Sequence, residues 1–232
     1  MNPTIPDDPA QLPLGETEGL PMLPPHDDPV VQGLEQGETA LARHDLAAAL
    51  RAFRSVLAVE PSHVRARLRL AYTLDQMGSP DAAIAELDRA LTQYPDNVTL
   101  LCGRAALASA RLRYDAAEAD LKRALRLTES NGEVHTQLGI LLCRKARWRE
   151  AIEPLKRAVE LDPAQSLPYY HLGEAYNHVD QLDAARAAYE RAADLDPTNW
   201  RALKGLGVIL DRQQRPVEAA AAYRRSREVQ RA

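Results

Sequence analysis

The stretch 167–197 constrains the fold most, because it predicts two amphipathic helices that pack very closely together. Gly173 in the first helix and Ala185 in the second are small where the two backbones approach, so a larger side chain would push the helices apart. Pro197 cannot continue a helix and therefore ends the second one. One such pair cannot bury its own apolar face, so it requires neighbours of the same kind.

The same pattern recurs every 34 residues from residue 30 onward, without insertion or deletion. The position of Gly173 holds only glycine or alanine, at Gly37, Ala71, Ala105, Gly139, Gly173 and Gly207. The position of Ala185 holds only alanine, at Ala49, Ala83, Ala117, Ala151, Ala185 and Ala219. A fixed period of this length indicates an array of stacked helix pairs.

These residues resemble the tetratricopeptide repeat, a helix–turn–helix unit. In the fifth unit the resemblance is carried by Tyr169, Leu172, Gly173, Tyr176, Ala185, Tyr189, Ala192 and Pro197. It covers residues 30–232 and implies an all-α fold, a right-handed superhelical solenoid of tandem repeats. The repeats are expected at 30–63, 64–97, 98–131, 132–165, 166–199 and 200–232.

Residues 1–29 differ in composition and are expected to form a disordered, acidic, proline-rich leader. They hold eight of the 16 prolines and six acidic residues, with no lysine or arginine. The net charge of the leader is −6, which leaves +2 for residues 30–232 because the total is −4. Such a segment cannot bury enough apolar surface to offset its ordering entropy.

Bulk features predict a cytoplasmic protein that does not insert into a membrane. No run of 18 apolar residues exists, and the N-terminus has neither the basic nor the apolar region of a secretory signal. Cys102 and Cys143 form no disulfide framework, since they are expected on successive first helices about 10 Å apart along the axis. Only four of the 29 basic residues are lysines, and this bias, with the abundant alanine, hints at a bacterial source.

Departures from the pattern mark the third repeat and both ends of the array. In the third repeat Arg104 replaces the usual leucine and Glu129 the usual proline, so looser packing or a change of superhelix is expected there. The first repeat is irregular at Gly33 and Gln36. The arginine-rich helix expected near 216–231 either covers its own apolar face with arginine stems or docks onto another copy.

No catalytic or cofactor signature is present in the sequence. It lacks a glycine-rich phosphate loop, G-x-S-x-G and H-E-x-x-H. His171, Glu174 and His178 share one helix face and could hold a metal, but a solvated polar patch is the favoured interpretation. We therefore predict no enzyme, no metal and no cofactor. Nucleic-acid binding is also not predicted, because the chain is acidic overall and poor in aromatic residues.

The resemblance implies a binding groove on the concave surface, lined by the first helix of each repeat. Residues at repeat positions 2, 5, 9, 12 and 13 would meet a peptide or a helix. The predicted groove residues are Arg65, Leu68, Arg69, Tyr72, Cys102, Ala106, Thr136, Ile140, Cys143, Tyr170, Glu174, His178 and Lys204. No repeat combines lysine at position 5 with asparagine at position 9, so the chaperone-binding clamp of some family members is not predicted.

The predicted function is a non-enzymatic adaptor that binds a protein or peptide segment in this groove. The alternative is a scaffold whose copies associate through the terminal repeats or the leader. The leader itself is either a solubilising tail or an occupant of the groove through its apolar clusters 12–14 and 20–25.

Overall fold

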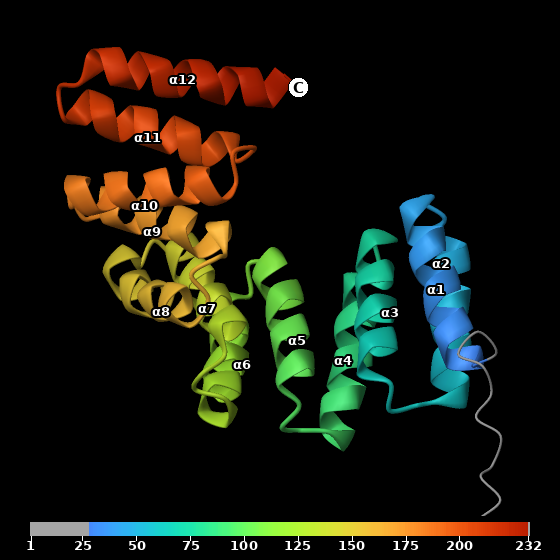
Figure 1. The fold of residues 1–232 in the computed structure, drawn as a ribbon. Coiled ribbons are helices and arrows are strands. Elements are labelled where there is room, and N and C mark those ends of the chain that lie inside the picture. Colours follow the sequence, from blue (N-terminus) through green and yellow to red (C-terminus); the bar gives the residue numbers. More distant parts are fainter. Residues whose placement is uncertain (1–27, 232) are drawn as a thin grey trace, which may run out of the picture.

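A computed structural model describes residues 28–231, which form twelve α-helices and no β-strand (Figure 1). The predicted leader lies outside the described residues except for Asp28 and Pro29, which begin the first helix. The helices are α1 (Pro29–Ala42), α2 (Leu46–Val59), α3 (Val64–Gln76), α4 (Pro80–Gln93), α5 (Val98–Ala110), α6 (Tyr114–Leu127), α7 (Gly132–Arg144), α8 (Trp148–Leu161), α9 (Ser166–His178), α10 (Leu182–Leu195), α11 (Trp200–Arg212) and α12 (Pro216–Arg231).

Most first helices begin at a residue whose side chain caps them. The side chains of Asn97, Asn131 and Asn199 accept hydrogen bonds from backbone N–H groups in the first turns of α5, α7 and α11. Asp28 plays the same part for α1, and Pro29 follows it at the position where a helix tolerates proline best. These caps fix where the first helix of each such pair starts.

The turn between the two helices of each pair places one residue in the left-handed region. These residues are His44, Gly78, Leu112, Ala146, Asp180 and Gln214, each one repeat length from the next. Only the second repeat uses glycine, the residue that adopts a positive φ without steric cost. The other five hold a conformation that L-residues disfavour, so the geometry is imposed by the packing of the flanking helices.

Close helix crossings occur where the small residues were predicted. A Cβ atom built on Gly173 would lie 2.6 Å from Cδ1 of Tyr189, whose side chain is 3% exposed. Gly139 and Leu155 repeat this arrangement in the fourth repeat, where the added Cβ would lie 2.4 Å from Cγ of the leucine. A larger residue at either glycine would separate the helix pair.

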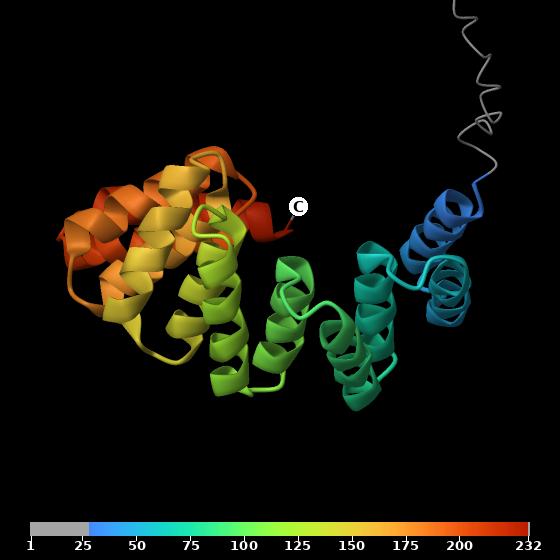
Figure 2. The same cartoon turned by 90° about the horizontal axis from the view of Figure 1, so that it is seen from below.

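The helix pairs stack in two layers that curve, as Figures 1 and 2 show. From α3 onward, each first helix also contacts the first helix of the next repeat. Successive second helices make no comparable contacts in the described part of the chain, so the first helices form the inner, concave layer. The predicted all-α solenoid is confirmed.

The junctions on either side of the third repeat, α4 with α5 and α6 with α7, are less extensive than the junctions between the fourth, fifth and sixth repeats. Arg104 stands where a leucine is usual, and its guanidinium is paired with two carboxylates. It donates to both carboxylate oxygens of the buried Asp120 on α6, at 2.8 and 2.7 Å, and to Asp88 on α4 at 2.6 Å. The repeat therefore replaces an apolar contact with a bidentate ion pair.

Candidate binding groove

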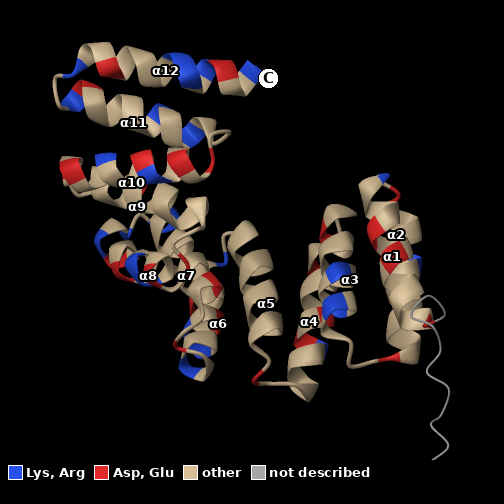
Figure 3. Cartoon of the chain, in the orientation of Figure 1, with Lys and Arg blue, Asp and Glu red and all other residues tan. Residues whose placement is uncertain are grey.

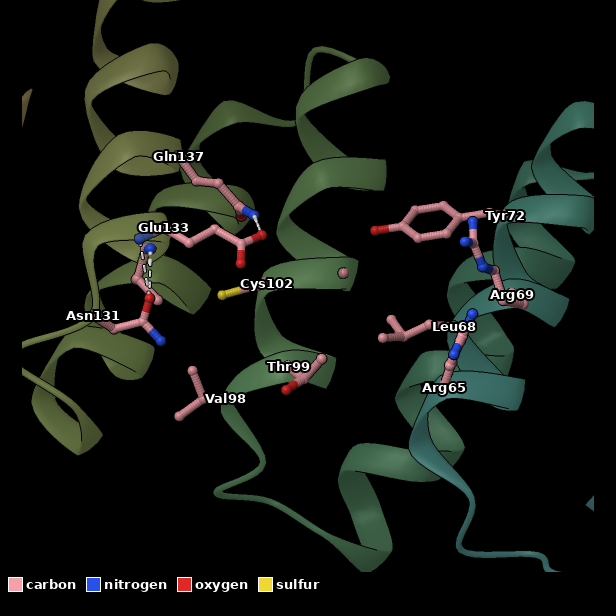
Figure 4. Close-up of a pocket in the computed structure, with 12 residues that line it drawn as sticks. Arg65, Leu68, Arg69, Tyr72, Val98, Thr99, Cys102, Asn131, Glu133 and Gln137 are labelled. Atoms are coloured by element: carbon pink, nitrogen blue, oxygen red, sulfur yellow. Dashed lines mark hydrogen bonds between the residues drawn. The ribbon is translucent and has the colours of Figure 1, made fainter. Parts of the chain in front are cut away.

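Side chains from α3, α5 and α7 surround a hollow of about 300 Å³ on the concave layer (Figure 4). We call it the α3–α7 hollow. Five of the predicted groove residues lie together here: Arg65, Leu68, Arg69, Tyr72 and Cys102. Glu133 and Gln137 of α7 close the opposite side, where the amide of Gln137 donates to the Glu133 carboxylate at 3.2 Å. The hollow thus combines an apolar floor with charged walls.

The two arginines of this hollow share one carboxylate from the first repeat. Glu38 accepts from Nη2 of Arg65 at 3.1 Å and from Nε of Arg69 at 2.8 Å. Arg65 remains 63% exposed at its side chain, so its guanidinium can reach a ligand without leaving Glu38. One carboxylate for two arginines leaves a positive balance at this edge of the hollow.

Burial keeps the thiol of Cys102 and the phenol of Tyr72 in their protonated, neutral forms. It raises the pKa of the Cys102 thiol to about 12, with the nearby carboxylates of Glu133 and Asp120 adding to the effect. The pKa of Tyr72 is also raised, mainly by burial. The thiol and the phenol therefore act as apolar surface and hydrogen-bond donors rather than as nucleophiles.

A second hollow, of about 270 Å³, lies between α5 and α7. We call it the α5–α7 hollow. Two further predicted groove residues, Ala106 and Ile140, lie in it, over a floor that includes Leu121 and Leu141. Arg144 is its one charged lining residue. Gln137 lines both hollows, so the two adjoin along the concave layer.

A polar cluster marks the fifth repeat of the groove. The Tyr170 hydroxyl donates to one oxygen of Glu174 at 2.7 Å, and Nδ1 of His171 lies 2.7 Å from the other. Burial raises the pKa of Glu174, but the bonds from His171 and Tyr170 outweigh it, so the net pKa is lowered and the carboxylate stays ionised. Cys143 is buried beside this cluster, and burial raises its pKa to about 12.

Three predicted groove residues lie apart from the hollows described above. Thr136 lines a separate hollow between α7 and α9, where its hydroxyl donates to the Gly132 carbonyl at 2.8 Å. His178 stacks on Trp148 at the edge of the array, with ring centroids 3.8 Å apart and planes 6° apart. Lys204 is exposed on α11, beyond the polar cluster. The other ten of the thirteen predicted residues lie in the α3–α7 hollow, in the α5–α7 hollow or at the polar cluster.

Several lining residues escaped the sequence prediction, although the position rule covered some of them. Thr99 and Glu133 occupy position 2 of their repeats, and Ala110 and Arg144 occupy position 13. Applying the rule to every repeat finds these four. Gln137 occupies position 6, which the rule omits, so no sequence signal marked it.

Two models of the tetratricopeptide repeat match the sequence, one over residues 40–105 and the other over 102–166 and 170–231. The second alone covers more than half of the chain, and its matches follow the helix pairs of the third to sixth repeats. The chain belongs to the tetratricopeptide repeat family. No curated protein matches it in sequence.

Solved structures show the same fold at low sequence identity. PilF of Pseudomonas aeruginosa is 21% identical, with a TM-score of 0.73 over 84% of this chain and 89% of that protein. MamA of Desulfovibrio magneticus is 23% identical, with a TM-score of 0.65 over 72% and 95%. YrrB, a repeat protein with an unusual peptide-binding site, is 22% identical, with a TM-score of 0.61 over 78% and 94%. At these identities the likeness shows a shared architecture.

The described residues include neither a candidate membrane span nor a candidate metal site. None of the twelve helices has the length and apolar character needed to cross a bilayer. Residues 28–231 contain no group of three or more histidine, cysteine or acidic side chains placed to hold a metal ion.

Proposed function

We propose that the protein is a non-enzymatic adaptor that binds a protein or peptide segment along its concave layer. The observation that carries this proposal is the α3–α7 hollow, where apolar side chains lie between charged walls. An extended segment could place one side chain among Leu68, Tyr72 and Cys102 and a carboxylate beside Arg65. The peptide-binding site of YrrB supports peptide binding as a use of this architecture.

The groove offers different chemistry at its two ends and its middle. Arg65 and Arg69 provide positive charge at one end, and the ionised Glu174 provides negative charge toward the other. Figure 3 shows no charged residues on the visible side of α5, between the charged surfaces of α3 and α7–α8. The proposed ligand therefore has an apolar centre and an acidic residue that lies over the second repeat.

Selection on the full chain tests the proposal. A phage-displayed library of random 16-residue peptides would be selected on the purified protein, and the enriched peptides would be titrated by fluorescence anisotropy. Thr99→Trp fills the α3–α7 hollow, and Arg65→Glu reverses charge at its edge. Each is expected to weaken binding at least about tenfold, which corresponds to about 1.4 kcal/mol.

The matched controls are Thr92→Trp and Arg89→Glu, both at exposed positions on α4 in the outer layer. Equal loss in a groove variant and its control would contradict the proposal, as would enriched peptides that bind all four variants like the parent.

The cytoplasmic location predicted from the sequence belongs to the same proposal, and Cys102 and Cys143 as free thiols agree with it.

A scaffold function is the second candidate, and one observation favours it. Val217 on α12 is 83% exposed and lies next to the exposed alanines 220 and 221, on the side where a further repeat would stack. At the opposite end of the array, Gln32, Glu35 and Gln36 of α1 are exposed. Association through α12 predicts concentration-dependent mass in light scattering that Val217→Glu abolishes. A monomer at all concentrations excludes it.

A further inference from the structure

The α5–α7 hollow exists because the third repeat carries small residues where other repeats carry large ones. Ala106 stands where the second and fourth repeats have Tyr72 and Ile140. Ala110 stands one turn later, and both alanines are exposed. The volume of about 270 Å³ is below the range of about 300–1,000 Å³ that small-molecule sites occupy. It suits a large aliphatic side chain rather than a cofactor.

One unpaired cation stands at the rim of this hollow. Nη1 of Arg144 donates to the Ser109 hydroxyl at 2.9 Å. Arg144 is exposed and forms no ion pair within residues 28–231. No acidic side chain lines the hollow. An aliphatic side chain with a carboxylate close to it in sequence therefore matches both the lining and the rim.

We infer that this hollow holds the leader of the same chain, with the cluster 12–14 as its anchor. Leu12 and Leu14 supply the aliphatic side chains, and Asp7 and Asp8 precede them closely enough to meet Arg144. Residues 1–27 contain five acidic residues and no lysine or arginine, so every fixed side-chain charge in the segment is attracted by the arginines of the groove. The inference rests on the proposed function, because it concerns an occupant of the same groove.

The order of residues along the leader agrees with the order of the hollows. The leader joins the array at Asp28, on the side of the first and second repeats. Glu16 and Glu18 follow the anchor toward that junction, and the α3–α7 hollow with Arg65 and Arg69 lies between the α5–α7 hollow and the first repeat. One extended segment can thus follow both hollows in sequence, with Gln137 where they meet.

The leader is long enough for this placement. The fourteen peptide steps from Leu14 to Asp28 span at most about 50 Å when extended. Successive packed helices lie about 8–10 Å apart and α5 is about 20 Å long, so the path from the start of α1 to the hollow is about 30–40 Å. Tethering also raises the local concentration of the leader to roughly millimolar, at which a weak contact is populated.

Photo-crosslinking on the full chain tests the inference. The variant Leu14→benzoylphenylalanine is irradiated, and the crosslinked peptides are identified by mass spectrometry. We expect crosslinks to peptides within residues 98–144 in protein that stays monomeric. Ala106→Leu fills the hollow and should lower the crosslink yield about tenfold, the effect of about 1.4 kcal/mol on a weak contact. The matched control is Ala116→Leu, an exposed alanine of α6 in the same repeat, which should leave the yield unchanged.

A second readout uses the peptides selected for the proposed function. Leu12→Ser/Leu14→Ser removes the anchor and should tighten binding of those peptides about twofold or more, since it frees the fraction of grooves that the leader occupies. Crosslinks in a dimer, crosslinks elsewhere, or a yield that Ala106→Leu does not lower would each overturn the inference. If the crosslink fails while selected peptides still bind and lose affinity in Thr99→Trp, the inference falls and the proposed function stands.

Discussion

The third and fifth repeats hold the same helix–turn–helix geometry by different chemistry. In the fifth, the ring of Tyr189 lies against two glycines, Gly173 of its own repeat and Gly205 of the next. In the third, Arg104 joins α5 to Asp120 and Asp88 by charge-assisted hydrogen bonds. The 34-residue repeat thus accommodates an ionic joint in which both oxygens of the buried Asp120 accept hydrogen bonds.

The difference also bears on the groove. In the fifth repeat the ring of Tyr189 fills the space between the two helices. The Tyr170 ring packs near it, with ring centroids 6.1 Å apart. The third repeat exposes Ala106 and Ala110 toward the groove instead. The α5–α7 hollow, which we propose binds an aliphatic side chain, is therefore lined in part by small residues of the irregular third repeat.

The largest expected effect comes from removing the ring of Tyr189. Tyr189→Ala deletes a ring that is 3% exposed and contacts two repeats, so it should lower the free energy of unfolding by about 3–5 kcal/mol. Urea denaturation followed by circular dichroism measures it. The control is Tyr94→Ala, since Tyr94 is 41% exposed at the end of α4. Equal losses in the two variants would show that the Tyr189 ring does not stabilise the packing of the fifth repeat against the sixth.

The ionic joint should respond differently to single and double substitution. Arg104→Leu leaves Asp120, which is 8% exposed, as a buried carboxylate without its partner, so we expect a loss of about 2–4 kcal/mol. Arg104→Leu/Asp120→Ala restores the residues that the fifth repeat has at Leu172 and Ala188. The double variant should match or exceed the parent in the same urea titration. A single variant as stable as the parent would contradict the role of the joint.

A second ionic group joins the third repeat to the fourth and makes stability depend on pH. Lys122, Lys145 and Arg147 all donate to the buried Glu118, at 2.8, 2.7 and 2.8 Å. The bonds from Lys122, followed by those from Lys145 and Arg147, lower the pKa of Glu118 to about 2 against the opposing effect of burial. The folded-state pKa lies below the unfolded value, so this stability is present above about pH 4.5 and is lost as pH falls toward 2.

Glu118→Gln should remove this contribution and flatten the curve of stability against pH in that window. We expect a loss of about 1–2 kcal/mol at pH 7, reduced by solvent screening because Lys122 is 56% exposed. Thermal or urea unfolding at a series of pH values from about 2.5 to 7 measures it. The control is Glu160→Gln, whose carboxylate pairs with Arg157 at 56% exposure. A parallel pH profile for the two variants would refute the assignment.

Periodicity predicted the fold because it reports features that the backbone itself requires. The small residues of the Gly173 and Ala185 series lie at helix crossings as predicted. The first repeat was expected to begin at residue 30, and α1 begins at Pro29, directly after its cap Asp28. A pattern that repeats six times constrains helix positions more strongly than any single cap.

The same reasoning predicted the site less well, for physical reasons. Long charged side chains choose partners in three dimensions, so the bonds of Arg104 and Glu118 could not be derived from spacing alone. A hollow forms where side chains are small, so Ala110 contributes to the α5–α7 hollow as much as Arg144 does. His178 followed the groove rule but stacks on Trp148 of the neighbouring repeat, because an aromatic partner was available there.

The smallest expected effect concerns the turns that precede α4 and α6. Leu112 in the third repeat has a φ of 58° and is 71% exposed, while Gly78 in the second has a φ of 76°. Leu112→Gly relieves a left-handed conformation that costs an L-residue about 1–2 kcal/mol, and the greater freedom of glycine in the unfolded chain offsets part of the gain. We therefore expect a stabilisation of about 0.5–1 kcal/mol in urea denaturation, and for Gly78→Ala a loss of similar size. If both variants shifted stability in the same direction, the left-handed conformation would not determine the stability of these turns.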